Sequence, residues 1–378
     1  MPSYDLDSIY HDSKNYGYLT TKGKRLIKHP VGRDFKITKI ETCLETGIQY
    51  LTFETKYGGK TVHHTLSRKQ LNYEGMNELA SKGFDIKDLN LFLLLISDKE
   101  DEYFATQTVE FTHTGVGWIK IPDEYKKDIS SPDGYAYRHH NKVGTTNSKY
   151  TGDLNIEPKG TLKKQCAFIK KYIQGYTPTE IAVAIGLSAV VNGRLRSIVH
   201  NLNIIAHFVG DSSTGKTTAA MLAVSVAGKP SLQETSLMTA WSSTANALIA
   251  RIRKNKGMPT ALDELSKYLN GSLTTAVYSL SDGRDKDRLN KDASLKTTSN
   301  TDGFETTIIS TGEATISGKC SNNTGIKARL IEIDTKFTPD AKTADIIKKR
   351  LSGELWSFSS GSCFLYARKR NRLCSISI

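Results

Sequence analysis

Short runs in which apolar and polar residues alternate dominate the first part of the chain. The run Gln49–Thr55 alternates, a Gly-Gly pair follows it, and Lys60–Thr65 alternates again. This pattern is typical of a β-hairpin closed by a glycine turn. Glu110–Lys120 looks like a further pair of strands. We therefore expect residues 1–150 to form a β-rich α+β module.

Longer periods replace this alternation in the second part of the chain. The polar, turn-rich stretch 130–152 separates the two parts and is the predicted linker. Beyond it, Thr161–Tyr172 and Thr179–Asn192 have helical spacing. The mostly apolar run Asn203–Val209 predicts a buried strand, and Thr217–Val226 predicts a helix. Helices and strands then alternate, as a parallel α/β sheet requires.

The loop between this strand and this helix reads Gly210-Asp-Ser-Ser-Thr-Gly-Lys-Thr217 and fits the phosphate-binding pattern G-x-x-x-x-G-K-[ST]. The glycines let the backbone wrap until its N–H groups point at phosphates, the lysine reaches the β- and γ-phosphates, and the last hydroxyl ligates Mg²⁺. The following helix N-terminus favours an anion further. An ordinary glycine-rich turn is the alternative. The residues expected to contact ATP are Gly210, Asp211, Ser212, Ser213, Thr214, Gly215, Lys216, Thr217 and Thr218, and Thr217 is also expected to bind Mg²⁺.

Two adjacent carboxylates, Asp263 and Glu264, end a modestly apolar run that follows the loop at a distance sufficient for an intervening helix. ATP hydrolysis needs a carboxylate that holds the metal and a base that activates water. We expect Asp263 to hold Mg²⁺ through water and Glu264 to orient and deprotonate the attacking water. A solvated strand end would carry the same residues and is the alternative.

Two later strands carry further candidates. Glu305–Glu313 reads as a strand that delivers Ser310 and Thr311 to the C-terminal edge of the sheet, where α/β sheets bind ligands. One of these hydroxyls is expected to sense the γ-phosphate, with a capped strand end as the alternative. Arg329 stands at the start of the strand that ends at Ile333. It is expected to act as an arginine finger on a neighbour's γ-phosphate, with a surface ion pair as the alternative.

Composition restricts the partners and the compartment. The 378-residue chain is 38% hydrophobic and 24% charged, as in soluble globular proteins. Its net charge of +13 favours a polyanion, and beside a phosphate-binding loop nucleic acid is the expected partner. The opening residues show no secretory signal and no apolar run is long enough to cross a bilayer, so we expect a cytoplasmic protein without a membrane partner. The five cysteines are far apart and include no C-x-x-C pair, which argues against a zinc ribbon or a disulfide framework.

Five motifs in order resemble those of the domain-of-unknown-function-927 family. These are helicase-like ATPases of bacterial mobile elements, and the chain is similar to their MCM-like AAA+ helicases of staphylococcal cassette chromosomes. The resemblance extends over roughly residues 118–333. The motifs that carry it are His207–Thr218, Trp241–Leu248, Ala261–Glu264, Val277–Gly283 with Arg288, and Ile309–Glu313.

The resemblance implies an α/β P-loop ATPase domain of AAA+ type at residues 151–340, preceded by the β-rich α+β module as a DNA-binding or collar domain. By this likeness the phosphate loop binds ATP with Mg²⁺, Asp263 and Glu264 form the second motif, and Arg329 is the finger. A homo-oligomer is also implied, in the form of a hexameric ring around single-stranded or forked DNA. The chain departs from the AAA+ pattern at the sensor, where an asparagine is usual.

In the resembled ring ATPases an insert before the sensor strand projects into the channel, and here it contains Arg288, Lys291 and Lys296. We expect these cations to contact DNA phosphates, while the aspartates between them favour a solvated loop as the alternative. Residues 341–378 are expected to form a partial helical lid and a truncated or frameshifted tail. Together with the phosphate-loop motif, the resemblance implies a bacterial ATP-driven DNA helicase or translocase of a mobile genetic element, with a non-motor nucleotide switch or replication loader as the alternative.

Overall fold

The computed structural model describes residues 8–131, 133–195, 198, 203–233, 235–269, 271–283, 303–320 and 324–353. The chain forms two compact units, residues 1–112 and 113–378. Both units combine helices with sheets, and the predicted α/β class is confirmed. Among the helices of the described residues, none combines the length and the apolar character needed to cross a bilayer.

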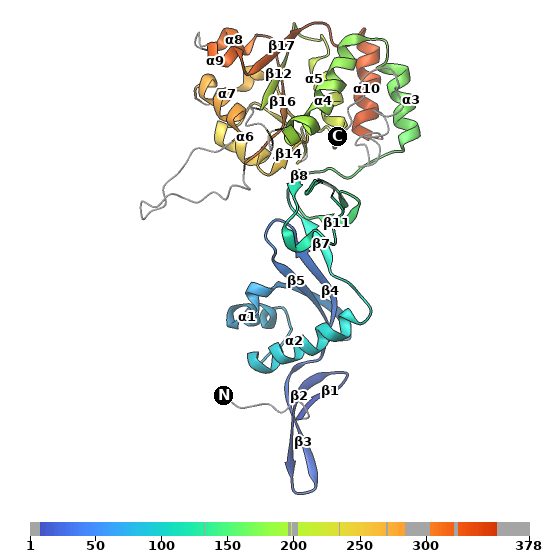
Figure 1. The fold of residues 1–378 in the computed structure, drawn as a ribbon, viewed down its shortest axis with the longest axis vertical. Helices are drawn as coiled ribbons and strands as arrows, with labels where there is room; N and C mark the ends of the chain where they lie inside the picture. Colours follow the sequence, from blue (N-terminus) through green and yellow to red (C-terminus); the bar gives the residue numbers. More distant parts are fainter. Residues whose placement is uncertain are drawn as a thin grey trace. The chain divides into compact units, whose positions relative to one another are not determined.

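The N-terminal unit is rich in antiparallel strands (Figure 1). One sheet contains β1 (Ile9–His11), β2 (Asn15–Lys22) and β3 (Arg25–Arg33). In a second group β4 (Phe35–Cys43), β5 (Gln49–Tyr57) and β6 (Lys60–Ser67) are antiparallel, and β7 (Glu110–His113) is parallel to β4. The predicted hairpin is confirmed, because β5 and β6 pair around their glycine turn.

An aromatic cluster forms the core of this unit between the strands and the helices α1 (Tyr73–Ser81) and α2 (Leu89–Phe104). The ring of Phe35 lies edge-on to Phe92 at 5.3 Å between centroids, and edge-on to Phe53 at 5.6 Å. Helix α2 begins where the Asp88 carboxylate accepts a hydrogen bond from the Leu91 N–H. Such a cap satisfies a backbone donor that the first helical turn leaves unpaired.

The second unit begins with a short antiparallel sheet. Its strands are β8 (Val116–Lys120), β9 (Tyr135–His139), β10 (Lys142–Val143) and β11 (Thr146–Tyr150), and β14 (Asn255–Lys256) is parallel to β8. Both strands predicted over residues 110–120 are therefore present, as β7 and β8, but β8 pairs with β9 and β14 instead of with β7.

The stretch 130–152, predicted as a linker, provides three of these strands instead. Its polar composition does not indicate a solvent-exposed linker, because some of these polar side chains are buried and have hydrogen-bond partners. Arg138 is 3% exposed and donates to backbone carbonyls of β8. The Trp118 Nε1–H of β8 donates to the Val190 carbonyl at 2.8 Å. The strands between residues 116 and 150 therefore pack inside the second compact unit, which starts at His113 and not near residue 150.

A five-stranded parallel sheet forms the centre of this unit. The predicted helices over 161–172 and 179–192, the strand over 203–209 and the helix after the phosphate loop are confirmed. In spatial order the strands are β13 (Met238–Ala240), β15 (Thr260–Asp263), β16 (Thr307–Gly312), β12 (Ile204–Val209) and β17 (Leu330–Asp334).

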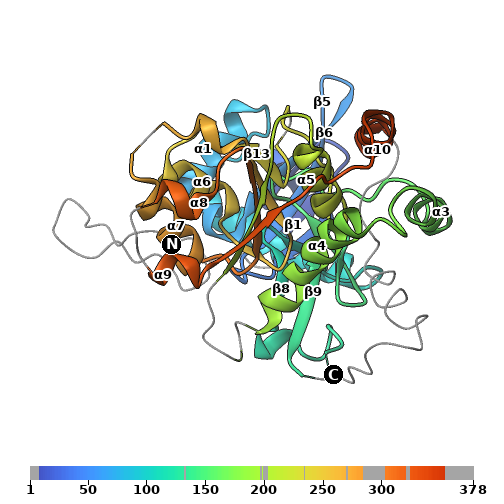
Figure 2. The ribbon, with the colours of Figure 1, turned by 90° about the horizontal axis from the view of Figure 1, so that it is seen from above.

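Helices cover both faces of this sheet (Figures 1 and 2). Because side chains alternate along a strand, Ile205 of β12 joins the core on one face while Ala206 and Phe208 join the core on the other. One face carries α4 (Thr177–Leu195), α5 (Lys216–Ser225) and α10 (Ala341–Gly353), and the other carries α6 (Ala245–Ile252) and α7 (Leu273–Asp282). The remaining described α-helices are α3 (Leu162–Tyr172), α8 (Ile316–Lys319) and α9 (Thr324–Lys327).

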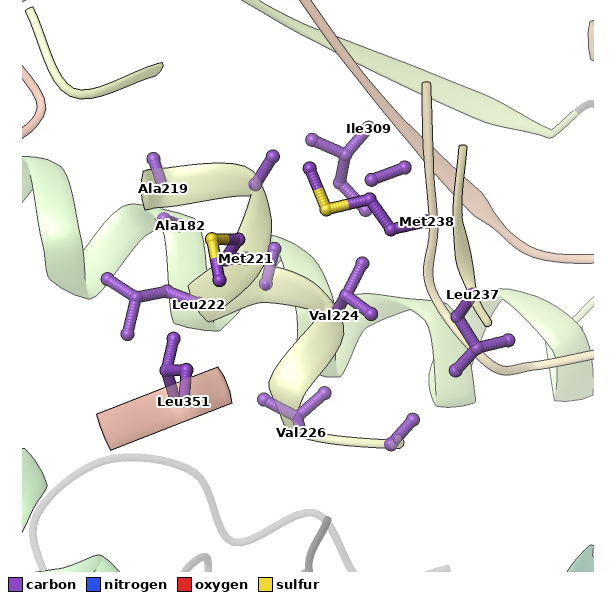
Figure 3. Close-up of a cluster of buried hydrophobic side chains, with 14 of the residues drawn as sticks. Ala182, Ala219, Met221, Leu222, Val224, Val226, Leu237, Met238, Ile309 and Leu351 are labelled. Atoms are coloured by element: carbon purple, nitrogen blue, oxygen red, sulfur yellow. The ribbon is translucent and has the colours of Figure 1, made fainter. Parts of the chain in front are cut away.

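Helix α5 is buried along almost its whole length (Figure 3). Leu222 and Val224 pack in a cluster with Ala182 of α4, Ile309 of β16 and Leu351 of α10. Because neighbours on several sides fix this helix, the loop that precedes it has a rigid support.

Candidate nucleotide site

The predicted phosphate loop links the carboxyl end of β12 to the start of α5. Gly215, the residue before the helix, has φ 88°, and a Cβ there would lie 2.5 Å from the Thr338 hydroxyl oxygen. Gly210 has φ 148°, and Ser213 adopts a left-handed φ of 65° that is uncommon outside glycine. The backbone therefore follows a tight path that needs glycine at both ends, as the motif predicts.

The Lys216 side chain folds back over this loop. Its Nζ donates to the carbonyl oxygens of Gly210 and Asp211, each at 2.7 Å, and the residue is only 8% exposed. The ammonium group thus lies over the loop that leads into α5, and the first N–H groups of a helix have no partner within the helix itself. A positive charge and helix N–H groups at one place form an environment for phosphate.

Residues from α5, β15 and β16 meet around one carboxylate. The Thr217 hydroxyl donates to Asp263 Oδ1 at 3.0 Å, and the Thr311 hydroxyl donates to the same oxygen at 2.8 Å. Asp263 is 6% exposed. The structure therefore brings together three residues that the sequence predicted separately, and it does so because β16 lies between β12 and β15.

The backbone of Glu264 is in the left-handed region, with φ 64° and ψ 82°. The Glu264 backbone N–H donates to the Thr311 hydroxyl at 2.8 Å, and the Glu264 side-chain Oε1 accepts from the Ser266 hydroxyl at 2.7 Å. A non-glycine residue in this conformation costs about 1–3 kcal/mol, and such strain is concentrated at functional sites. Since the Thr311 hydroxyl accepts from the Glu264 N–H and donates to Asp263 Oδ1, it connects the two acidic residues.

Ser310 points to the opposite side of β16 from Thr311. It is fully buried, its Oγ accepts from Trp241 Nε1 at 3.0 Å, and it lies 2.9 Å from His207 Nδ1. Because His207 Nε2 lies 3.0 Å from the Ala314 carbonyl, that nitrogen carries the proton and Ser310 donates to Nδ1. Burial lowers the pKa of His207 and keeps the ring neutral near pH 7. The sequence motifs did not reveal that His207 and Trp241 support the site.

Arg329 lies directly before β17 and contacts its own chain. Its Nη1 donates to the Gly325 carbonyl at 2.7 Å, its guanidinium is 4.8 Å from the Tyr278 ring centroid, and Nη2 is 3.9 Å from Asp282. Since β17 runs parallel to β12, Arg329 is at the amino end of the sheet and the phosphate loop is at the carboxyl end. Five residues of strand separate these ends by roughly 15 Å, so Arg329 does not reach the phosphate loop of its own chain.

The predicted DNA contacts Arg288, Lys291 and Lys296 lie outside the described residues. The described part of the chain also contains no group of three or more His, Cys, Asp or Glu side chains that is able to hold a metal. A Mg²⁺ site at Thr217 and Asp263 would not need one, because Mg²⁺ is usually bound by one or two protein oxygens together with substrate phosphates and waters.

Comparisons with known proteins agree with the resemblance seen in the sequence. The chain is similar in structure to a solved protein described as "SCCmec type IV Cch - active helicase", with a TM-score of 0.65 and 24% sequence identity. The match covers 97% of this chain and 65% of the other, so this chain spans about two-thirds of the length of that protein. This likeness shows a shared fold. No curated protein sequence matches the chain.

A family model described as domain of unknown function (DUF927) matches residues 31–300. The matched range includes the phosphate loop and the Asp263–Glu264 pair, and it covers more than two-thirds of the chain. The chain therefore belongs to the DUF927 family.

Proposed function

We propose that this chain is a DNA-dependent ATPase of the AAA+ helicase type, which uses ATP hydrolysis to move on DNA in the bacterial cytoplasm. The observation that carries the proposal is the hydroxyl–carboxylate–hydroxyl arrangement of Thr217, Asp263 and Thr311 beside a phosphate loop. The net charge of +13 supports DNA as the partner, as does the similarity to a protein described as an active helicase.

Each group at the site has a role in this proposal. Lys216 and the N–H groups of the loop bind the phosphates, and Thr217 and Asp263 supply the oxygen ligands that Mg²⁺ prefers. Held by these residues, Mg²⁺ would supply positive charge beside the β- and γ-phosphates. Glu264 orients a water and accepts its proton. The Thr311 hydroxyl holds Glu264 and Asp263 in fixed positions, because it accepts from the Glu264 N–H and donates to the Asp263 carboxylate.

Strand separation distinguishes the motor from its alternative. A motor should displace the labelled strand of a forked duplex only when hydrolysable ATP is present, and Lys216→Ala should displace none. Nucleotide-dependent assembly on DNA without strand displacement would instead indicate a non-motor switch or loader.

Thr311 and Ser310 should respond differently to loss of the hydroxyl. Thr311→Val should lower ATP turnover by about tenfold to a hundredfold, because Glu264 and Asp263 lose their shared partner. Ser310→Ala should leave turnover nearly intact but lower the melting temperature, because Trp241 and His207 lose a buried partner at about 1–3 kcal/mol. Steady-state phosphate release and thermal unfolding measure the two effects. The reverse pattern would make Ser310 the sensor.

Arg329 should act across a subunit boundary, because it does not reach the loop of its own chain. Arg329→Ala should bind ATP normally and hydrolyse it about a thousandfold more slowly. Mixing it with Lys216→Ala should restore part of the activity, since some interfaces then combine an intact loop with an intact arginine. Lys327→Ala, an exposed neighbour, is the matched control. Absence of rescue at every mixing ratio, with assembly confirmed by light scattering, would count against a shared site and the hexameric ring.

A further inference from the structure

The hairpin of β2 and β3 is basic, and its lysines and arginines lie at the turn and along β3. Between Asn15 and Arg33 the sequence contains five lysines and arginines and no aspartate or glutamate. In the N-terminal unit the hairpin extends away from α1 and α2, with its turn at the far end (Figure 1). The outer part, from Thr20 to Lys28, is exposed at every residue. We call residues 20–28 the ribbon tip.

The base of the hairpin is firmly held. Tyr16 and Val31 are buried in the core of the unit, and Tyr18 stacks on His29 with 4.7 Å between ring centroids. Gly17 is at a bulge, where a Cβ would lie 2.0 Å from the His29 carbonyl oxygen. The ribbon tip is therefore an exposed extension of a fixed base.

Three features leave the ribbon tip only weakly stabilised by its own contacts. Lys22 stands directly opposite Arg25 in the pairing register, and like charges at this position repel. Leu26 is 70% exposed and Ile27 is 38% exposed. A two-stranded ribbon without a further strand is at best marginally stable in water. A polyanion bound at the tip would compensate the repulsion and cover the apolar side chains.

The shape and the chemistry of the tip fit duplex DNA. The major groove is about 12 Å wide and admits a two-stranded ribbon. Because faces alternate along a strand, Thr20, Lys22, Arg25 and Ile27 share one face of the ribbon. Lysine and arginine bind guanine edges and phosphates, and threonine and apolar side chains contact bases and the thymine methyl group. The described residues show no ion pair with Lys22, Lys24 or Arg25.

We infer that the ribbon tip binds duplex DNA in the major groove, as a contact separate from the nucleotide site. The inference rests on the proposed function for the identity of the polyanion. The hairpin holds the duplex while the ATPase domain acts on it, so its loss weakens DNA binding without changing ATP binding.

The test compares two charge-matched variants of the full chain in binding to a fluorescein-labelled duplex, followed by fluorescence anisotropy. The first combines Lys22→Ala, Lys24→Ala and Arg25→Ala. We expect its dissociation constant to rise about tenfold or more, and the slope of log affinity against log salt to flatten by about two to three units, since each lost phosphate contact removes about 0.9. All three positions are exposed, so the melting temperature should not fall.

The control variant combines Lys56→Ala, Lys60→Ala and Lys69→Ala, which removes the same charge from exposed sites around the β5–β6 hairpin. We expect it to retain the wild-type affinity and salt slope. If both variants lose the same affinity for DNA, the loss comes from the lower overall charge and not from the ribbon tip, and the inference is overturned.

Other outcomes separate this inference from the proposed function. A variant with Lys22→Arg, Lys24→Arg and Arg25→Lys should bind DNA like the wild type, because charge is conserved. If the wild type binds duplex DNA and the alanine variant binds it equally well, the inference is wrong and the proposed function stands. If the wild type binds no DNA, the inference and the proposed function are both wrong.

Binding to phosphatidylserine vesicles tests the alternative of a membrane surface. If the alanine variant loses binding to these vesicles but not to DNA, the hairpin binds a membrane surface and the inference is overturned.

Discussion

Glu264→Gln should lower ATP hydrolysis by about a hundredfold to ten-thousandfold while ATP binding stays intact. The amide keeps the size of the side chain and an oxygen that accepts the hydrogen bond from Ser266, so the left-handed backbone and its N–H bond to Thr311 should persist. What the substitution removes is the ability to accept a proton from water. The predicted loss corresponds to about 3–5 kcal/mol of activation free energy.

Single-turnover phosphate release, with bound ATP measured in parallel, separates these effects for Glu264→Gln. The matched control is Glu313→Gln, an exposed glutamate just after the end of β16, which should hydrolyse ATP normally. If Glu264→Gln releases phosphate at the wild-type rate, another group is the base and the strained conformation of Glu264 has a different origin.

Lys216→Ala should weaken ATP binding itself. Removing one partner of a buried charge pair costs about 2–5 kcal/mol, which is about a thirtyfold to several thousandfold loss of affinity. Because a ligand that binds only the folded protein stabilises it by RT ln(1 + [L]/Kd), ATP at a concentration well above the wild-type Kd and below that of the variant should raise the melting temperature of the wild type and not that of Lys216→Ala. Thermal unfolding with and without Mg²⁺–ATP measures this.

Two controls show whether a lost ATP-dependent shift in Lys216→Ala reflects lost ATP binding. Lys267→Ala removes an exposed charge in the short helix that follows Glu264, and it should retain the ATP-dependent shift. The melting temperature without nucleotide reports whether Lys216→Ala is folded, because loss of the ammonium leaves the Gly210 and Asp211 carbonyls without that donor. A full ATP-dependent shift in Lys216→Ala would place the nucleotide elsewhere.

The sequence was most informative where local chemistry determines the structure. The glycines of the phosphate loop, the apolar strand before it and the helix after it follow from backbone sterics and periodicity, and all are present as predicted. The β5–β6 hairpin was predictable for the same reason.

Features that depend on distant partners were not predictable. Alternation along a strand shows that Ser310 and Thr311 face opposite sides, but only the placement of β16 between β12 and β15 shows which of them meets Asp263. The polar composition of residues 130–152 indicates a linker, whereas in the structure polar side chains such as Arg138 are buried and find their partners on another strand. The left-handed conformation of Glu264 likewise depends on Thr311, which lies far away in the sequence.

We propose that one site, formed by the phosphate loop, Asp263 and Glu264, hydrolyses ATP in response to DNA. The most direct measurement is steady-state phosphate release by the wild-type chain with Mg²⁺–ATP, in the presence and absence of forked DNA, with Lys216→Ala as the background. We predict release above this background that increases when DNA is added. Release no faster than that of Lys216→Ala, with or without DNA, would contradict the account.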